Sequence, residues 1–224
     1  MSVKDSCKVR DIVVGHQFRL VLYSDGSLYS WGINNKGCLG IGKEIHHCHN
    51  QLVRVDIEDV VEVKLGANHV LALTKMGEVY AWGDNSRGQV GFKKFRDNNR
   101  TDKIAHSSVI YSPKKVYPPA ASFPRTYKKA IQIVAYENTS FLLTDGLIPV
   151  KTINLEEEEE IIEEPQTEYH DEVFGWGHND HGILLSPFRY VRCPYRLDLG
   201  VTSIERIDVQ DNHVIGYSYK HLCK

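Results

Sequence analysis

The sequence has little of what defines several common protein classes. No apolar run approaches the roughly 20 residues that a membrane-spanning helix needs. The N-terminal stretch "MSVKDSCKVRDIVV" lacks the charged start and apolar segment of a secretory signal. The net charge over 224 residues is only −2, which gives no overall attraction to nucleic acid or membranes. We therefore expect the protein in the cytoplasm, the nucleus or both, and not at a membrane.

Metal-binding and redox motifs are also scarce. The five cysteines include no C-x-x-C pair, so neither a zinc ribbon nor a redox motif is indicated, and free thiols in a reducing compartment are the simplest interpretation. The stretch "HHCHN" (His46 to Asn50) holds three imidazoles and a thiol. Adjacent residues cannot all face one ion, and no second ligand pair lies at a useful spacing. We expect no metal site.

Catalytic signatures are missing from the sequence as well. It contains no nucleophile elbow, phosphate-binding loop or H-E-x-x-H. The glycines of "WGDNSRGQVG" are not a dinucleotide-binding fingerprint, because no helix follows them to receive a pyrophosphate. The sequence predicts no enzyme activity and no cofactor.

What the chain does have is an internal repeat. "GSLYSWGINNKGCLG" (26–40) and "GEVYAWGDNSRGQVG" (77–91) match at one constant offset. A looser third copy comprises "NTSFLLTDG" (138–146) and "VFGWGHNDHGIL" (173–184), and the half copy "SIERIDVQDNHVIGYS" closes the chain. The predicted structural residues of the repeat are Gly15, Gly26, Trp31, Gly32, Gly37, Gly40, Gly66, His69, Gly77, Trp82, Gly83, Gly88, Gly91, Gly146, Trp176, Gly177 and Gly182.

Each copy predicts about four short antiparallel strands. "VVEVKL", "HVLALT" and "EVYAWG" are β-branched or alternating in polarity over five to six residues, and "NQLVRVDI" can supply a fourth strand. "SDG" and "KMG" supply turns whose glycine can take a positive φ. Such a sheet cannot bury both faces alone, and stacked copies make the continuous core of a propeller. The tryptophans then pack between blades.

These motifs resemble the repeat of the regulator of chromosome condensation (RCC) family, with its G-x-x-H, D-G and W-G-x-N-x-x-G-Q-L-G signature. The resemblance is strongest over 66–91 and implies blades of a seven-bladed β-propeller. Phe18 and Thr139 replace the motif's histidine, and Tyr136 replaces its first glycine. We therefore predict an all-β fold, an incomplete RCC-type propeller of about three four-stranded blades plus a half blade, and we expect a fragment, a truncated product or a chain whose open ends need a partner.

The predicted organisation is an RCC-like region over 8–224 with two insertions of opposite charge. Its parts are repeat 1 (8–58), repeat 2 (59–117), repeat 3 (129–199) and a half repeat (203–224). The insertion 93–129 carries ten basic and two acidic residues and is mostly loop, with "SPKKV" as a possible fourth strand. The insertion 151–172 carries ten acidic residues and one basic residue, a composition that predicts disorder. Attraction between the two insertions is an alternative.

Candidate partner-binding residues lie in the loops and in the basic insertion. They are Asn34, Lys36, Asp84, Asn85, Arg87, Lys114, Lys115, Lys128 and Lys129. Loop residues at matching places in the copies, Asn179 and Asp180 included, could meet a partner. Asn and Asp equally form turns by bonding their own backbone, and we favour that structural interpretation. The lysines could meet an acidic partner or a phosphate backbone, although we favour a solvated insertion.

Three functions follow from this reading. The first is a non-catalytic propeller scaffold that binds proteins. The second, implied by the resemblance, is guanine nucleotide exchange on a Ras-like small GTPase, which needs only a surface that favours the nucleotide-free partner. The third is association with chromatin or nucleic acid through the basic insertion. The resemblance also implies a small GTPase or a ubiquitin-ligase component as possible partners, whereas a nucleic-acid partner is less expected.

Overall fold

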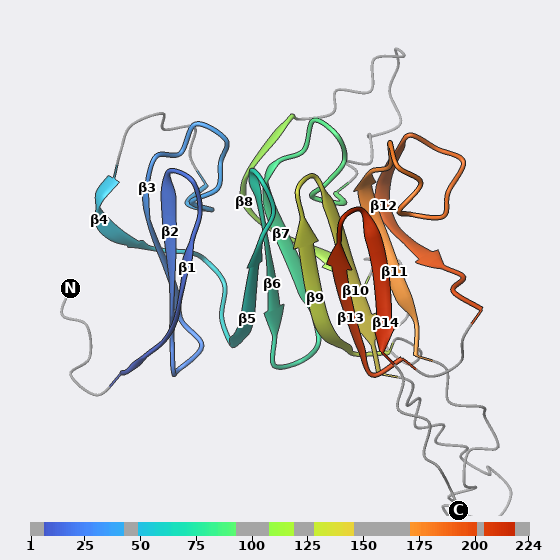
Figure 1. The fold of residues 1–224 in the computed structure, drawn as a ribbon. Helices are drawn as coiled ribbons and strands as arrows, with labels where there is room; N and C mark the ends of the chain where they lie inside the picture. Colours follow the sequence, from blue (N-terminus) through green and yellow to red (C-terminus); the bar gives the residue numbers. More distant parts are fainter. Residues whose placement is uncertain are drawn as a thin grey trace, which may run out of the picture.

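The computed structural model describes residues 7–42, 49–92, 108–118, 128–145, 171–200 and 204–217. Within these ranges all of the regular secondary structure is β-strand. The strands form antiparallel sheets that stand side by side in chain order (Figure 1). Three sheets have four strands and one has two. The prediction of an all-β, incomplete propeller with three blades and a half blade is confirmed.

Every full blade is a meander in which each strand pairs with the next one along the chain. Blade 1 has β1 (Val9–Val14), β2 (Phe18–Tyr23), β3 (Leu28–Gly32) and β4 (His49–Arg54). Blade 2 has β5 (Val60–Leu65), β6 (His69–Thr74), β7 (Val79–Asp84) and β8 (Val109–Tyr117). Blade 3 has β9 (Ala130–Tyr136), β10 (Thr139–Thr144), β11 (Val173–His178) and β12 (Tyr190–Leu197). The half blade has β13 (Arg206–Gln210) and β14 (His213–Tyr217).

The second strand of blades 2 and 3 is buried on both faces, because neighbouring strands and neighbouring blades cover it. All six residues of β6 and of β10 are buried, which explains why "HVLALT" and "SFLL" are nearly continuous apolar runs. The core is one cluster that runs through all the blades, with Leu20, Leu71 and Phe141 fully buried. Each blade therefore depends on its neighbours for burial.

The turn between the second and third strands ties blade 1 to blade 2 and blade 2 to blade 3. The carbonyl of Gly26 accepts a hydrogen bond from the amide of Val60 at 3.0 Å, and the carbonyl of Gly77 accepts one from the amide of Ala130 at 3.1 Å. We call the end of the blades that carries these turns the hairpin end. The opposite end, at the top in Figure 1, carries the connections that follow β3, β7 and β11, and we call it the loop end.

Strand β1 exposes apolar side chains at positions that are buried in blade 2. Val9 is 51% exposed, whereas Val60, at the same place in the repeat, is 1% exposed. Ile12 is likewise exposed, and its counterpart Val63 is buried. The face of blade 2 that holds Val60 and Val63 packs beside blade 1.

Some predictions lie outside the described residues. They are the disorder of the acidic insertion over 151–170, the cluster at 46–48, Gly146, and the parts of the basic insertion at 93–107 and 119–127. Within the basic insertion, the predicted strand "SPKKV" is part of β8, which begins earlier, at Val109. The proposed domain boundaries remain predictions.

Candidate functional site at the loop end of the blades

The tryptophan of a later blade hydrogen-bonds the loop of the blade before it. The Trp82 Nε1 donates to the Cys38 carbonyl at 2.9 Å, and the Trp176 Nε1 donates to the Gln89 carbonyl at 2.9 Å. Both indoles are fully buried, whereas Trp31 in blade 1 is only half-buried. These bonds fix where each loop lies on the next blade.

The last glycine of the repeated motif, Gly40 in blade 1 and Gly91 in blade 2, lies against the indole of the next blade. A Cβ on Gly91 would lie 2.6 Å from the Trp176 Nε1, and one on Gly40 would lie 2.8 Å from the Trp82 Nε1. Both glycines also have a left-handed φ, +72° and +68°. Space and backbone conformation therefore both require glycine there.

A polar chain crosses the junction between blades 2 and 3. The Ser140 hydroxyl donates to the Gln89 carbonyl at 2.8 Å, so its oxygen accepts from the His69 Nε2 at 2.8 Å. His69 is completely buried, and among the described residues its Nδ1 has no hydrogen-bond partner. Burial lowers the pKa of His69 to about 4, because the charged imidazolium would lose its hydration. The ring is therefore neutral at pH 7, with its proton on Nε2, and its role is structural.

One buried asparagine organises the loop of each full blade. Asn34, Asn85 and Asn179 accept through Oδ1 from the backbone amide five residues later, at 3.0, 3.1 and 2.7 Å. All three side chains are buried. The geometry favours the structural interpretation of Asn34 and Asn85 over partner binding.

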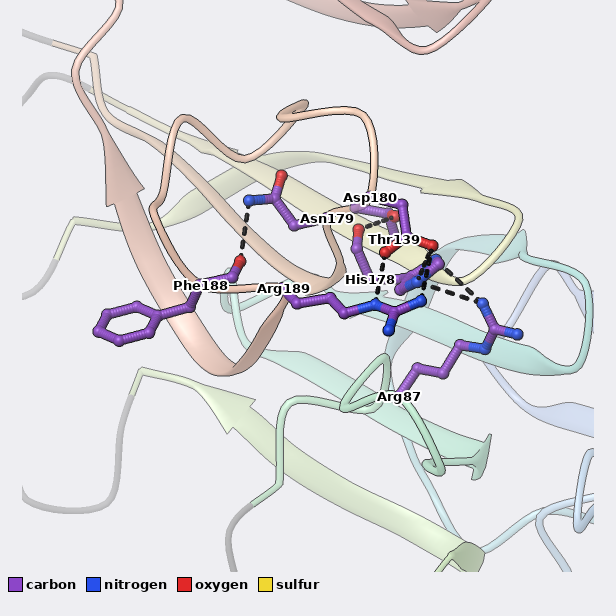
Figure 2. Close-up of polar contacts among 7 residues, drawn as sticks. All are labelled: Arg87, Thr139, His178, Asn179, Asp180, Phe188 and Arg189. Carbon is purple, nitrogen blue, oxygen red and sulfur yellow. Dashed lines mark hydrogen bonds and ion pairs between the residues drawn. The ribbon is translucent and has the colours of Figure 1, made fainter.

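The loop of blade 3 is clamped by further bonds. The Asn179 Nδ2 donates to the carbonyls of Ser186 and Phe188 at 2.8 and 3.0 Å. Arg189 forks onto the Asp180 carboxylate, with Nε 2.7 Å from Oδ1 and Nη2 3.4 Å from Oδ2. The Phe188 side chain points away from these contacts (Figure 2) and is 68% exposed. The loop therefore holds its backbone in place while presenting an aromatic ring to solvent.

A polar cluster joins this loop to blade 2. Figure 2 shows the Arg87 guanidinium reaching across to His178, where its Nη1 lies 3.0 Å from Nδ1 and 3.3 Å from Nε2. The other ring nitrogen, Nε2, lies 2.7 Å from the Asp180 Oδ2. The Thr139 hydroxyl donates to the His178 carbonyl at 2.9 Å and fixes the backbone below the ring.

The histidine in this cluster is neutral at pH 7. Burial lowers the pKa of His178 and Arg87 adds to the lowering, which outweighs the opposite effect of Asp180. The contacts then assign the tautomer, because Nε2–H donates to Asp180 while Nδ1 accepts from Arg87. The contact between His178 and Asp180 is therefore a hydrogen bond from a neutral imidazole to an ionised carboxylate, and not a pair of opposite charges. The hydrogen bonds from Arg189 hold the pKa of Asp180 below its usual range.

The structure separates the candidate partner-binding residues. Lys36 and Arg87 are exposed at the loop end, whereas Asp84 is buried beside Asn85 and accepts the Ser86 amide at 3.0 Å. Of these candidates, only Arg87 belongs to the cluster of Figure 2.

The candidate lysines of the basic insertion lie away from that cluster. Lys114 and Lys115 are on β8, and the Lys115 ammonium lies 3.0 Å from the Glu78 carboxylate. Lys128 is mostly buried and lies 3.9 Å from Glu172, while Lys129 packs against Gly77 at the hairpin end. The structure does not bring these lysines together with Arg87.

Sequence reasoning missed most of the exposed surface of the blade 3 loop. Leu185, Phe188, Arg189, Tyr190 and Arg192 were not candidates, although "PFRYVR" places arginines among aromatic residues. The rings of His178 and Tyr190 stack with centroids 5.4 Å apart, and Arg189 and Arg192 lie over the Tyr190 ring at 5.5 and 5.7 Å. The alternation of arginine and aromatic residues in this segment was the signal available in the sequence, but the sequence does not reveal which of these side chains are exposed.

Two further findings concern only the described residues. The described residues contain no helix that is long and apolar enough to cross a membrane. No group of three or more His, Cys, Asp or Glu side chains is arranged there to hold a metal ion.

The blades joined through tryptophan and glycine define a repeat protein of the β-propeller class. The model of the regulator of chromosome condensation (RCC1) repeat matches residues 25–73 and 76–143, and a second model of that repeat matches 9–38 and 60–89. The first model alone covers more than half of the chain. The chain therefore belongs to the RCC1 repeat family, as its motifs predicted.

Relatives in the family include much longer proteins. The chain is 38% identical over 102 residues to the ultraviolet-B receptor UVR8 of Arabidopsis thaliana, which is 45% of this chain and 23% of the receptor. It is 36% identical over 106 residues to human protein RCC2 (46% and 19%), and 42% identical over 84 residues to the human E3 ubiquitin-protein ligase HERC2 (37% and 2%). Each match therefore spans less than a quarter of the relative.

Solved structures support the fold. Human WBSCR16 superposes with a TM-score of 0.62 at 23% identity, covering 90% of this chain and 42% of that one. Prp20p of Saccharomyces cerevisiae, described with its binding properties to Gsp1p and histones, gives a TM-score of 0.58 at 21% identity, covering 85% and 38%. At these identities the similarity is one of fold.

Proposed function

We propose that this chain is a non-catalytic protein-interaction module that binds its partner at the loop end of blades 2 and 3. The observation that carries this proposal is the clamped loop of blade 3. It displays Phe188 and Leu185 while its backbone is held by Asn179 and by the fork between Arg189 and Asp180. Interfaces concentrate binding energy in aromatic and arginine side chains. A loop that is ordered before binding loses less entropy when a partner docks.

Family members are compatible with this assignment. The fold relative Prp20p is described with binding properties to Gsp1p and histones, which are proteins. The match to HERC2 covers only 2% of that ligase and gives no ground for assigning ligase activity to this chain. A propeller offers a broad rigid face, and its function resides in the side chains on that face.

The test is proximity labelling in cells with the full chain and two variants. Phe188→Ser removes the exposed ring at the loop end, and Met76→Ser removes a comparably exposed side chain, 56% accessible, at the hairpin end. We expect the proteins labelled by the wild type to be lost with Phe188→Ser and kept with Met76→Ser. Identical labelling by all three proteins would show that partners do not bind at the loop end.

Nucleotide exchange on a small GTPase is a second candidate. Its support is the family membership together with the description of Prp20p as a Gsp1p-binding protein. Such an activity requires a surface that binds the nucleotide-free GTPase more tightly than the loaded one. Release of a fluorescent nucleotide from a panel of Ras-like GTPases is the measurement, and no acceleration for any member would reject the activity.

Association with chromatin or nucleic acid through the basic insertion remains the third candidate. The ion pairs of Lys115 with Glu78 and of Lys128 with Glu172 already compensate part of the positive charge in the described residues. Binding through the lysines would weaken steeply with salt. A salt-independent affinity for DNA would exclude this mode.

A further inference from the structure

Two apolar side chains project from the clamped loop of blade 3. Phe188 is 68% exposed and Leu185 is 56% exposed. Leu185 has a left-handed φ of 47°, a conformation that a leucine adopts only when its surroundings hold it there. Its amide donates to the Gly182 carbonyl at 2.9 Å, and Asn179 holds the carbonyls of Ser186 and Phe188. The two apolar side chains therefore stand on a backbone that is already ordered.

Three arginines lie around the stacked rings of His178 and Tyr190, the residues that flank this loop. Arg189 and Arg192 both lie over the Tyr190 ring, which stacks on His178. Arg87 approaches the same histidine from blade 2. The neighbouring Gly88 lies against the backbone of Arg192, since a Cβ on it would be 3.1 Å from the Arg192 Cα. The guanidinium groups thus gather from two blades around one pair of stacked rings.

The charge of this surface is not balanced. Asp180 is the carboxylate of the cluster, and Arg189 already forks onto it. Within the described part of the chain, no carboxylate lies within ion-pair distance of Arg87 or Arg192, whose contacts are with the His178 ring and the Tyr190 face. The exposed Arg87 and the half-buried Arg192 therefore carry uncompensated charge at the same end of the blades that exposes Leu185 and Phe188.

We propose that Arg87, Arg192, Leu185 and Phe188 bind a partner segment that carries several carboxylates beside a large apolar side chain. This inference rests on the interaction-module function proposed above and specifies the chemistry of the partner. A guanidinium presents paired N–H donors that match a carboxylate, and the partner's apolar side chain packs on Leu185 and Phe188. The aliphatic Leu185 offers no stacking face to a base, which favours a peptide over a nucleic acid.

The experiment measures fluorescence anisotropy of a labelled peptide, Gly-Glu-Glu-Leu-Phe-Glu-Glu-Gly, with the full chain. Two matched peptides replace either the glutamates by glutamines or the Leu-Phe pair by Ser-Ser. We expect each replacement to weaken binding by about tenfold or more, as loss of an interface anchor does. Higher salt should weaken the glutamate peptide more than the glutamine peptide.

Variants of the protein locate the binding site. Arg87→Gln, Arg192→Gln and Phe188→Ser should each weaken the glutamate peptide, again by about tenfold, with unchanged thermal unfolding as the check on folding. Arg54→Gln, at an exposed arginine on β4, is the matched control and should bind as the wild type does. Using three variants keeps the test valid if one of them unfolds.

Several results would overturn the inference. These are equal binding of the glutamine peptide, binding unchanged by all three variants, or tighter binding of a short oligothymidylate that displaces the peptide. A failure of the peptides while Phe188→Ser still abolishes proximity labelling would reject the acidic partner and leave the interaction-module function standing. Unchanged labelling would reject the function itself.

Discussion

The junction between blades 1 and 2 and the junction between blades 2 and 3 use the same backbone plan with different side chains. In both, an indole donates to a loop carbonyl and a glycine lies under the indole. At the first junction Phe18 and Val70 occupy the repeat positions that His69 and Ser140 occupy at the second. Two apolar residues thus replace two hydrogen-bonded residues, and neither junction places an apolar residue opposite one polar member of the pair. The tryptophan and the glycine that shape the junction are the same at both junctions, whereas the residues at the other two positions differ as a pair.

The largest expected effect comes from breaking what the two junctions share. Gly91→Ala adds a Cβ 2.6 Å from the Trp176 Nε1 at a left-handed φ, and we expect a loss of about 3 kcal/mol or more in the free energy of unfolding. Gly200→Ala is the control, because Gly200 has a φ of +65° but no atom of the described residues lies within 4 Å of its Cβ position. It should cost about 1 kcal/mol. Urea unfolding measures both, and equal losses would show that contact with the indole is unimportant.

An intermediate effect should come from making the second junction resemble the first. His69 has a pKa of about 4 when folded, against an ordinary value of 6.5. Between these two values the unfolded chain binds a proton that the folded chain does not, so acidification from pH 6.5 to 4 should cost up to about 3 kcal/mol. His69→Phe should remove this loss, because a phenyl ring does not titrate.

The measurement for His69 is the free energy of unfolding as a function of pH. Ser140 keeps its bond to the Gln89 carbonyl in the variant, so a small change at neutral pH is expected. His213→Gln, at an exposed histidine on β14, should keep the pH dependence of the wild type. The same acid slope in His69→Phe would show that other groups cause it.

The smallest expected effect concerns the contact between Arg87 and His178, which crosses the second junction at the loop end. Arg87 lowers the pKa of His178 and Asp180 raises it. Arg87→Gln should therefore raise the pKa of His178, whereas Asp180→Asn should lower it further, with less than about 1 kcal/mol change in stability for Arg87→Gln. Titration of the His178 ring by NMR measures both shifts. Shifts in the same direction would contradict the tautomer and the contacts assigned here.

The fold was largely predictable because its signals are local and repeated. Alternating strands, turn glycines and the Trp-Gly pairs recur at one offset in the first two copies and in the same order in the third, so one copy supports the interpretation of the next. Even the departures have a physical reason. A Cβ on Gly15 would lie 2.5 Å from the Phe18 ring, and one on Gly66 would overlap the His69 ring. Thr139 is small, and the third copy can place Tyr136 where the others need glycine.

The candidate surface was much less predictable. Asn34, Asn85 and Asn179 occupy matching loop positions, and turn chemistry already favoured a structural role for them. The sequence does not show which backbone groups they bond or that their side chains are buried. The exposure of Phe188 depends on the path of the loop, which Asn179 and Arg189 hold through hydrogen bonds between residues nine positions apart. Arg87 and Arg192 come to the same pair of rings because blades 2 and 3 pack together, with Gly88 against the Arg192 backbone.

The hydrogen bonds of the tryptophans have a direction along the chain. In both junctions the donor belongs to the later blade and the acceptor to the earlier one, Trp82 to Cys38 and Trp176 to Gln89. A polypeptide is synthesised from its N-terminus, and domains fold as they emerge. Each acceptor carbonyl therefore leaves the ribosome before the indole that requires it, so a newly made blade docks on a template that has already been synthesised.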